Sequence, residues 1–286
     1  MSHRYKMAVY TIINEKQIET FFNTDTVIFS LSNHTWINMA KRVIIPLPHT
    51  DFDPTEAGVS WKCLTDRGVD VVFATPSGLV ATCDPIMLTG KGLSFLSPML
   101  RADKYGRAAY DEMAASREFK NPIKWSHLKQ ENFDGLLLPG GHAKGMLEYL
   151  ESNLLKQIVV DFFSIEKPVG AICHGVLLAA RSHYHNGKSV LFGRKTTALI
   201  ALQELTAWAL TAAWMKDYYR TYPQTLEAEV KSNLANSSDF IKGPMPLYRD
   251  NPAQLERGFT VRDKNYLSAR WPGDTHRFAN QFFELL

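Results

Sequence analysis

Apolar and polar positions along the chain form short apolar runs that are separated by longer amphipathic segments. Four runs rich in β-branched residues or leucine are RVIIPL (42–47), VDVVFA (69–74), FDGLLLPGG (133–141) and KPVGAI (167–172). Runs of this length without polar interruption are typical of parallel strands buried on both faces. Helix-like segments separate them: PTEAGVSWKCLTDRG (54–68) and AKGMLEYLESNLLKQIVVDFFSIE (143–166).

This alternation predicts an α/β fold, a flavodoxin-like three-layer αβα sandwich with a mainly parallel sheet and right-handed crossovers. The pattern returns at the end of the chain with GFTVRD (258–263), NYLSARW (265–271) and the helix-like DTHRFANQFFELL (274–286). Because ligands of open α/β sheets bind beyond the carboxyl ends of the strands, we look for the site there.

Three segments depart from the alternation. Residues 1–40 contain possible strands, AVYTII (8–13) and TVIFSL (26–31), and are interpreted as an N-terminal extension. Residues 88–120 are helix-like and follow a strand end, where a lid is commonly inserted. Residues 205–258 hold an aromatic helix and a loop rich in proline and asparagine. We therefore predict one domain, 41–286, with a helical cap formed by two insertions.

Composition narrows the function classes. The chain has 286 residues, of which 45% are hydrophobic and 21% charged, close to the averages of globular proteins. The net charge of +3 is not concentrated in a basic run, so nucleic acid is not an expected partner. The longest apolar stretch (196–215) contains Gln203 and Glu204 and is interpreted as a buried helix rather than a membrane span.

Cysteine and histidine patterns do not indicate a metal or another cofactor. The three cysteines form no CxxC pair, and the nine histidines form no HExxH motif. An odd number of dispersed cysteines favours a reducing compartment. The N-terminal residues do not show the pattern of a signal peptide, so we expect the protein in the cytoplasm.

The segment KPVGAICHGVLLAAR (167–181) contains the main candidate for catalysis. Cys173 lies between a predicted strand and a predicted helix, the position of a nucleophile elbow. The N-terminus of the helix is expected to favour the thiolate and lower the pKa of the thiol. A cysteine between apolar runs can also be a packed core residue, and that alternative stays open.

Two further motifs are expected at the same edge of the sheet. LLLPGGHA (136–143) places Gly140 and Gly141 after a strand, where their N–H groups can face a developing negative charge or form a simple tight turn. PHTDFDPTEAG (48–58) places Glu56 in the first turn of a helix, as an acid of the site or as a complement to the helix dipole.

In combination and in that order, DFDPTEAG, LLLPGGHA and AICHG resemble the ThiJ/PfpI superfamily of class I glutamine amidotransferase-like proteins. The sequence is most similar to the branch of heat-shock chaperones and glyoxalase III. The resemblance covers residues 42–204 and the final strand and helix. It implies a nucleophile at Cys173, an acid/base at His174 and an acid contacting the thiol at Glu56.

The resemblance also implies the remaining residues of the site. Glu204, after FGRKTTALIALQE, matches a carboxylate that orients the histidine in that branch, although a solvated helix residue is the alternative. The N–H groups of Gly141 and His174 are implied to form an oxyanion hole. Gly140 and His142 are expected to line the substrate site.

The implied function is cofactor-independent conversion of a small reactive carbonyl, such as methylglyoxal to lactate, or protein deglycation, in stress protection. Two alternatives stay open: a cysteine amidase, peptidase or nitrile-type hydrolase, and a non-catalytic holdase chaperone or redox sensor with unfolded protein clients. The family usually associates, which implies a homodimer. No membrane partner is expected.

Overall fold

The computed structural model describes residues 22–23, 26–27 and 40–286. The chain divides into two compact units, residues 1–39 and residues 40–286. In the first unit, β1 (Phe22–Asn23) pairs with β2 (Thr26–Val27) in antiparallel orientation. The strand predicted at 8–13 lies outside the described residues, and the one predicted at 26–31 is described only at its first two positions.

The second unit is built on a seven-stranded sheet with the order β10-β11-β9-β8-β3-β5-β7. Its strands are β3 (Arg42–Pro46), β5 (Asp70–Thr75), β7 (Ile123–Lys124), β8 (Gly135–Leu138), β9 (Val169–Ile172), β10 (Thr260–Asp263) and β11 (Tyr266–Ala269). All neighbours are parallel except β10 and β11. The order β5-β3-β8-β9-β11 is the flavodoxin-like arrangement, which confirms the predicted fold class.

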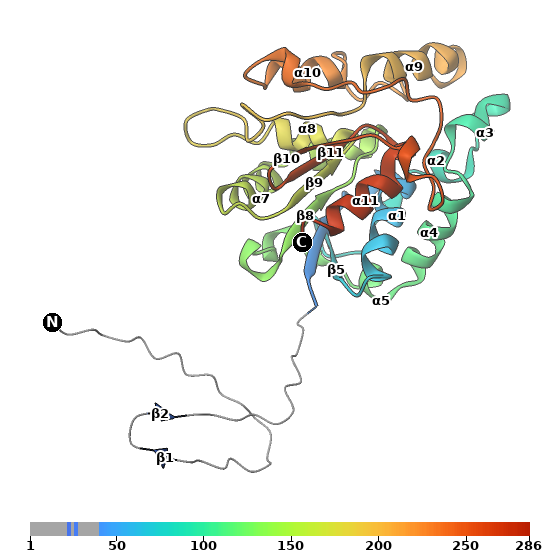
Figure 1. The fold of residues 1–286 in the computed structure, drawn as a ribbon. Coiled ribbons are helices and arrows are strands. Elements are labelled where there is room, and N and C mark those ends of the chain that lie inside the picture. The colour runs from blue at the N-terminus through green and yellow to red at the C-terminus, as the bar shows by residue number, and fades with distance from the viewer. Residues whose placement is uncertain (1–21, 24–25, 28–39) are drawn as a thin grey trace. The chain divides into compact units, whose positions relative to one another are not determined.

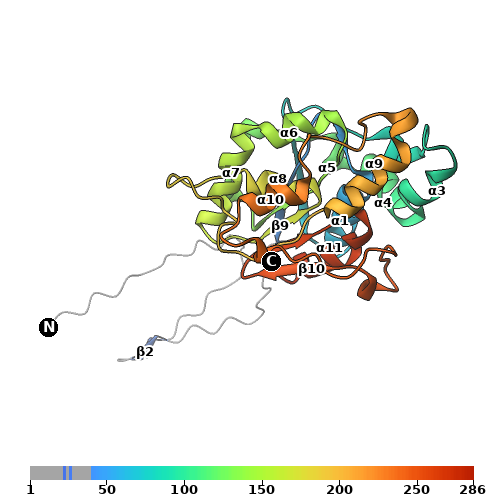
Figure 2. The same cartoon turned by 90° about the horizontal axis from the view of Figure 1, so that it is seen from above.

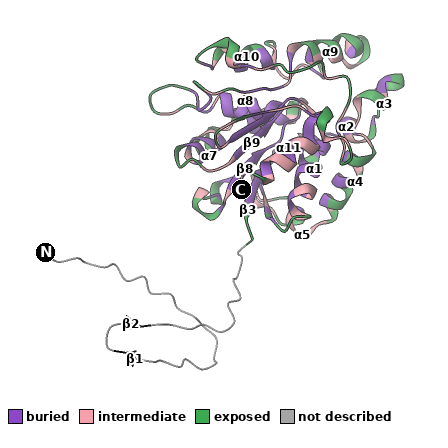
Figure 3. Cartoon of the chain, viewed as in Figure 1, coloured by how far each residue is buried: buried purple, intermediate pink, exposed green. Residues whose placement is uncertain are grey.

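The apolar runs form the centre of this sheet. Val43, Ile44 and Ile45 of β3 and all residues of β8 and β9 are buried. Figure 3 shows the central strands in the colour of buried residues. A strand covered on both faces needs apolar side chains at every position, and this is why these strands lack polar alternation. A separate pair of short parallel strands, β4 (Thr50–Phe52) and β6 (Thr82–Cys83), extends beyond the carboxyl ends of β3 and β5.

Helices cover both faces of the sheet (Figure 1). On one face α1 (Pro54–Thr65) packs against α11 (Thr275–Phe283), while α7 (Asn153–Ser164) and α8 (His174–Ala180) pack together on the other. Glycine permits the close contact on the first face: a Cβ at Gly170 would lie 2.7 Å from the Phe282 ring. All seven residues of α8 are buried.

The two predicted insertions form different structures. Residues 88–120 contain α3 (Ser97–Leu100), α4 (Lys104–Ala115) and α5 (Arg117–Lys120), preceded by α2 (Pro85–Thr89), and α4 packs along α1. The second insertion contains α9 (Ala201–Met215) and α10 (Leu226–Ser232), which lie over the α8 side of the molecule in Figures 1 and 2. The remaining helix, α6 (Leu147–Glu151), precedes α7. Within the described part of the chain, no helix combines the length and hydropathy needed to cross a membrane.

Candidate active site

Cys173 occupies the turn between β9 and α8, with backbone angles φ 54° and ψ −123°. A non-glycine residue at positive φ costs about 1–3 kcal/mol and persists only where the surrounding structure fixes it. The turn is fixed by close packing: a Cβ on Gly175 would lie 2.1 Å from the carbonyl oxygen of Leu138. The strand, the strained turn and the buried helix place Cys173 at the carboxyl edge of the sheet, as the nucleophile-elbow motif predicts.

Glu56 reaches the same edge from α1. Asp53 caps this helix by accepting hydrogen bonds from the N–H groups of Thr55 and Glu56 at 2.8 and 3.0 Å, and Pro54 follows as the first helical residue. The fully buried Glu56 carboxyl group accepts a hydrogen bond from Gly140 N at 2.7 Å. The Gly140 amide therefore supports Glu56 and is not available to an oxyanion.

Burial raises the pKa of Glu56 well above its ordinary value, and the neighbouring Asp53 raises it further. Burial also raises the pKa of Asp53, to about 6. The raised pKa favours the uncharged form of the Glu56 carboxyl group over a wider pH range than that of an exposed glutamate.

Burial also raises the pKa of the Cys173 thiol well above its ordinary value, with a further contribution from the Glu56 carboxyl group. This outcome corrects the sequence expectation of a lowered thiol pKa. The backbone N–H of His174 at the start of α8 does favour the thiolate. Removal of the thiol from water outweighs that effect, since Cys173 is only 5% exposed.

His174 lies between the thiol and the cap. Its Nδ1 is 3.4 Å from Cys173 Sγ, and its Nε2 is 3.1 Å from Thr221 Oγ1. Thr221 donates its single hydroxyl proton to the carbonyl oxygen of His142 at 2.6 Å, so Oγ1 must accept from His174 Nε2. Nε2 therefore carries the ring proton, and the lone pair of Nδ1 is left to accept a proton from the thiol.

The imidazole is neutral at rest. Burial, His142 and Arg181 lower the pKa of His174 to about 3. Thiol and imidazole are thus both uncharged before substrate arrives, and the thiol loses its proton to Nδ1 as it attacks. This is general-base activation of a nucleophile rather than a preformed ion pair.

Glu204 does not take the place implied by the resemblance. Its Oε2 accepts from Leu226 N at 2.9 Å, and its Oε1 is 3.3 Å from Arg220 Nε. Both nitrogens of His174 already have partners in Cys173 and Thr221. Glu204 thus joins the start of α10 to α9, and it lies in the cavity wall rather than on the histidine.

The remaining predicted residues line the cavity above the thiol. Gly141 and His142 both contribute to it, together with Cys173 and Asp53. The His142 ring stacks on Tyr219 with centroids 4.5 Å apart, and burial lowers its pKa. The cavity volume is about 490 Å³. The thiol, a neutral base and a partly open cavity therefore lie together at this edge of the sheet.

Residues 47–244 match the family model described as ThiJ/PfpI family-like. The chain belongs to this family. The match confirms the resemblance that the three motifs carried. It covers α1, β8, the elbow and both helices of the second insertion.

Curated relatives match part of the chain. An uncharacterized protein of Schizosaccharomyces pombe is 30% identical over 126 residues, covering 43% of this chain and 46% of the relative. Protein/nucleic acid deglycase 2 of Escherichia coli is 30% identical over 119 residues, covering 37% of this chain and 62% of the relative. The matched region spans less than two thirds of either ThiJ/PfpI relative.

The fold of this ThiJ/PfpI member also has solved counterparts. The crystal structure of glyoxalase III from Candida albicans superposes with a TM-score of 0.60, covering 86% of this chain and 97% of the other, at 18% identity. At this identity the similarity shows the fold. The family as a whole includes deglycases and glyoxalase III enzymes.

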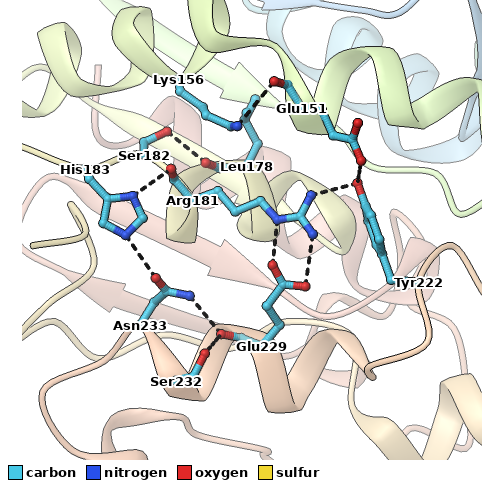
Figure 4. Close-up of polar contacts among 10 residues, drawn as sticks. All are labelled: Glu151, Lys156, Leu178, Arg181, Ser182, His183, Tyr222, Glu229, Ser232 and Asn233. Carbon is cyan, nitrogen blue, oxygen red and sulfur yellow. Dashed lines mark hydrogen bonds and ion pairs between the residues drawn. The ribbon is translucent and has the colours of Figure 1, made fainter. Parts of the chain in front are cut away.

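A polar network fixes the segment that carries Thr221 (Figure 4). Arg181, directly after α8, forms a bidentate pair with Glu229 of α10, with Nε–Oε1 and Nη2–Oε2 distances of 2.6 and 3.0 Å. Its Nη1 donates to Tyr222 Oη at 2.7 Å, and Tyr222 donates in turn to Glu151. Because Tyr222 follows Thr221 directly, the network holds the cap hydroxyl over His174.

Sequence reasoning missed Thr221, Asp53 and the Arg181 network. Asp53 carried a readable signal, an aspartate before Pro54 at a helix start, which is an N-cap pattern. Thr221 carried none. It lies 47 positions from His174 in an irregular loop, and only the docking of the cap brings the two side chains together.

Proposed function

We propose that this protein is a cofactor-independent cysteine enzyme that acts on small reactive carbonyl compounds, in the manner of a glyoxalase III or a deglycase. The observation that carries the proposal is the contact of Cys173 Sγ with the unprotonated Nδ1 of a tautomerically fixed His174, at the floor of a cavity. The deglycase and glyoxalase names among family members support the choice of substrate class.

With a 2-oxoaldehyde such as methylglyoxal, the thiol attacks the aldehyde carbon as its proton moves to His174 Nδ1. The imidazolium returns the proton to the new alkoxide, which gives a hemithioacetal. His174 Nδ1, which is again unprotonated, then takes the proton from the former aldehyde carbon, an enediol forms, and the same nitrogen delivers a proton to the adjacent carbon. The aldehyde carbon is oxidised and its neighbour reduced, so no external redox partner is required.

The product of these steps is a thioester of a 2-hydroxy acid, which water cleaves to release lactate and the thiol. The backbone N–H of His174 is directed to the thiol side of the elbow and stabilises negative charge near Sγ. The Gly141 N–H is the second proposed donor. Glu56, whose pKa is raised by burial, is the proposed acid beside the thiol.

The decisive experiment is lactate formation from methylglyoxal without glutathione or added metal, comparing wild type with Cys173→Ala. We expect the variant to lose turnover to the uncatalysed background. Cys63→Ala serves as the control, because this partly exposed thiol lies on α1 away from the cavity lining. Full turnover by Cys173→Ala would overturn the proposal.

Hydrolysis of an amide, peptide or nitrile is the second candidate, since the Cys173–His174 pair serves acyl transfer as well. The cavity volume favours it, because about 490 Å³ exceeds the need of a three-carbon substrate. Parallel panels of carbonyl, amide and nitrile substrates separate the two reactions. Stress protection, a cytoplasmic location and a homodimer are parts of the same proposal, and sedimentation of the purified chain tests the homodimer.

A further inference from the structure

The wall of the cavity above Cys173 is predominantly apolar. Its apolar side chains come from three parts of the chain: Met87, Met99 and Leu100; Leu199, Leu202, Ala207 and Leu210; and Met245, Leu247 and Trp271. The middle group belongs to α9 and the turn before it, so the cap supplies much of the wall. Such a wall stabilises a ligand by removing apolar surface from water.

The charged groups of the wall do not favour an anionic ligand. Among the described lining residues, the carboxyl and guanidinium side chains are Asp53, Glu204 and Arg249. Glu204 is paired with Arg220, and Arg249 donates to the backbone oxygen of Arg101 at 3.2 Å and lies close enough to Asp53 to lower its pKa. No excess positive charge is left to balance a carboxylate or phosphate, whose burial would be costly.

One donor in the wall suits an uncharged acceptor. Arg249 Nη1 is buried and has no hydrogen-bond partner in the part of the chain that the structure describes. A carbonyl or ether oxygen of a ligand satisfies such a group without bringing a second charge into the cavity. The wall therefore combines apolar contacts with a hydrogen-bond donor, Arg249 Nη1, that is unpaired among the described residues.

Bound methylglyoxal carries only one methyl group, so it would leave most of the apolar side chains of the cavity wall in contact with water. We propose that the cavity selects electrophiles with an uncharged, apolar body, so that the preferred substrates are 2-oxoaldehydes with a larger alkyl or aryl group than methyl. The reaction at Cys173 rests on the proposed function, whereas the selection by the cavity does not. Each buried methylene of the body is expected to accelerate reaction by about twofold to fourfold.

Alkylation of Cys173 tests the selection without requiring turnover. Iodoacetamide and its N-butyl and N-hexyl derivatives react alike: the S–C bond forms, the C–I bond breaks, iodide leaves, and the thiol proton passes through His174 to water. Peptide mass spectrometry follows Cys173, with Cys63 and Cys83 in the same chain as internal references. We expect the rate at Cys173 to rise at least about sixtyfold from the parent to the hexyl compound, because each of the six added carbons contributes at least about a factor of two, and iodoacetate to react more slowly.

Two alanines of α9 provide a matched pair of variants. Ala207 lines the cavity, whereas Ala209 is exposed on the same helix and is not among the lining residues. Ala207→Phe is expected to abolish the gain with chain length, and Ala209→Phe to retain it. If Ala207→Phe does not fold, Leu210→Ser against Leu205→Ser makes the same comparison, because only Leu210 lines the cavity.

A rate at Cys173 that is flat or falling with chain length overturns the inference, as does an equal response of the two alanine variants. Turnover of phenylglyoxal and methylglyoxal then separates the two proposals. Chain-length selection without turnover of either compound rejects only the proposed function. Turnover of methylglyoxal together with a flat alkylation series rejects only the selection by the cavity.

Discussion

At the scale of single residues, the hydroxyl group of Thr221 decides the protonation of His174. One hydroxyl proton donated to His142 O leaves the oxygen to accept from Nε2, and the base at Nδ1 follows from that bond. In other nucleophile sites a carboxylate usually fills this position. A neutral hydroxyl fixes the tautomer without stabilising an imidazolium, in agreement with the pKa of about 3 for His174.

Replacement of Thr221 by valine is therefore expected to reduce kcat by about twofold to tenfold, with little change in KM. The ring would then populate both tautomers, and only one leaves Nδ1 free to accept the thiol proton. Thr221→Ser keeps the hydroxyl and is expected to retain most of the activity. Steady-state kinetics and nitrogen NMR of the His174 ring measure the effect, and equal losses in both variants would contradict it.

The buried Glu56 carboxyl group of the site makes the stability of the folded protein depend on pH. Its pKa is raised in the folded protein by burial and by Asp53, so its contribution to stability is fully present below the ordinary value near 4.5. That contribution is lost as pH rises through the folded pKa, because the unfolded chain then releases the proton more easily. Glutamine cannot titrate and removes this dependence.

For Glu56→Gln we expect the wild type to lose stability relative to the variant as the pH rises above the ordinary glutamate pKa near 4.5. Urea unfolding at several pH values measures the difference in the free energy of unfolding. Glu131→Gln, at an exposed position, is the control and is expected to leave that difference independent of pH. If the free energy of unfolding of the wild type instead increased relative to that of Glu56→Gln as the pH rises, the raised pKa of Glu56 would be contradicted.

At the scale of elements, the cap is attached to the elbow helix through Arg181. Its pair with Glu229 joins the end of α8 to α10, and its bond to Tyr222 positions the loop between α9 and α10. The side chains of Arg181 and Glu229 are 18% and 19% exposed, so the pair is only partly screened by water. Loss of the network therefore affects folding and the position of Thr221 together.

Arg181→Met is expected to lower stability by about 2 kcal/mol and to lower kcat several-fold through displacement of Thr221. Lys62→Met breaks exposed pairs with Asp66 and Glu112 and is the control, with an expected loss below about 1 kcal/mol and unchanged kcat. Thermal unfolding and steady-state kinetics provide the two measurements. A stability loss with unchanged kcat would show that the network does not position Thr221.

At the scale of the whole second unit (residues 40–286), the central strands of the sheet are more deeply buried than helix α9 of the cap. All residues of β8 and β9 are buried, whereas α9 buries only Glu204 and Thr211 of its fifteen residues (Figure 3). Several large apolar side chains of α9 remain exposed, among them Leu202, Leu205, Leu210 and Trp214. Local opening costs least where few apolar contacts are lost.

Hydrogen exchange is therefore expected to be slowest in β3, β8 and β9 and fastest, among the longer helices, in α9. Mass spectrometry of peptic peptides measures the order, with α7 as a helix of comparable length that packs on the sheet. Protection of α9 equal to that of β9 would contradict the expectation. Opening of α9 would also widen the cavity, since α9 forms part of its wall.

Local patterns in the sequence were sufficient to predict the fold and to place Cys173, Gly140 and Glu56 at one edge of the sheet. Continuous apolar runs require burial on both faces, which predicted β3, β5, β8 and β9. The change from an apolar run to helical spacing at Cys173 predicted the elbow, and the motifs before it predicted that Gly140, Gly141 and Glu56 would lie at the same edge of the sheet. These features depend on residues close in sequence and on the rule that parallel strands end at one edge.

The tertiary structure alone decided how the site is protonated and enclosed. Thr221 rather than Glu204 orients His174, because Glu204 is already bound by Leu226 N and Arg220. Burial, a property of the whole fold, outweighs the helix N-terminus and raises the pKa of the thiol. Contacts between segments far apart in sequence carry no periodic signal, so the base, its partner and the apolar cavity appear only when the cap is docked.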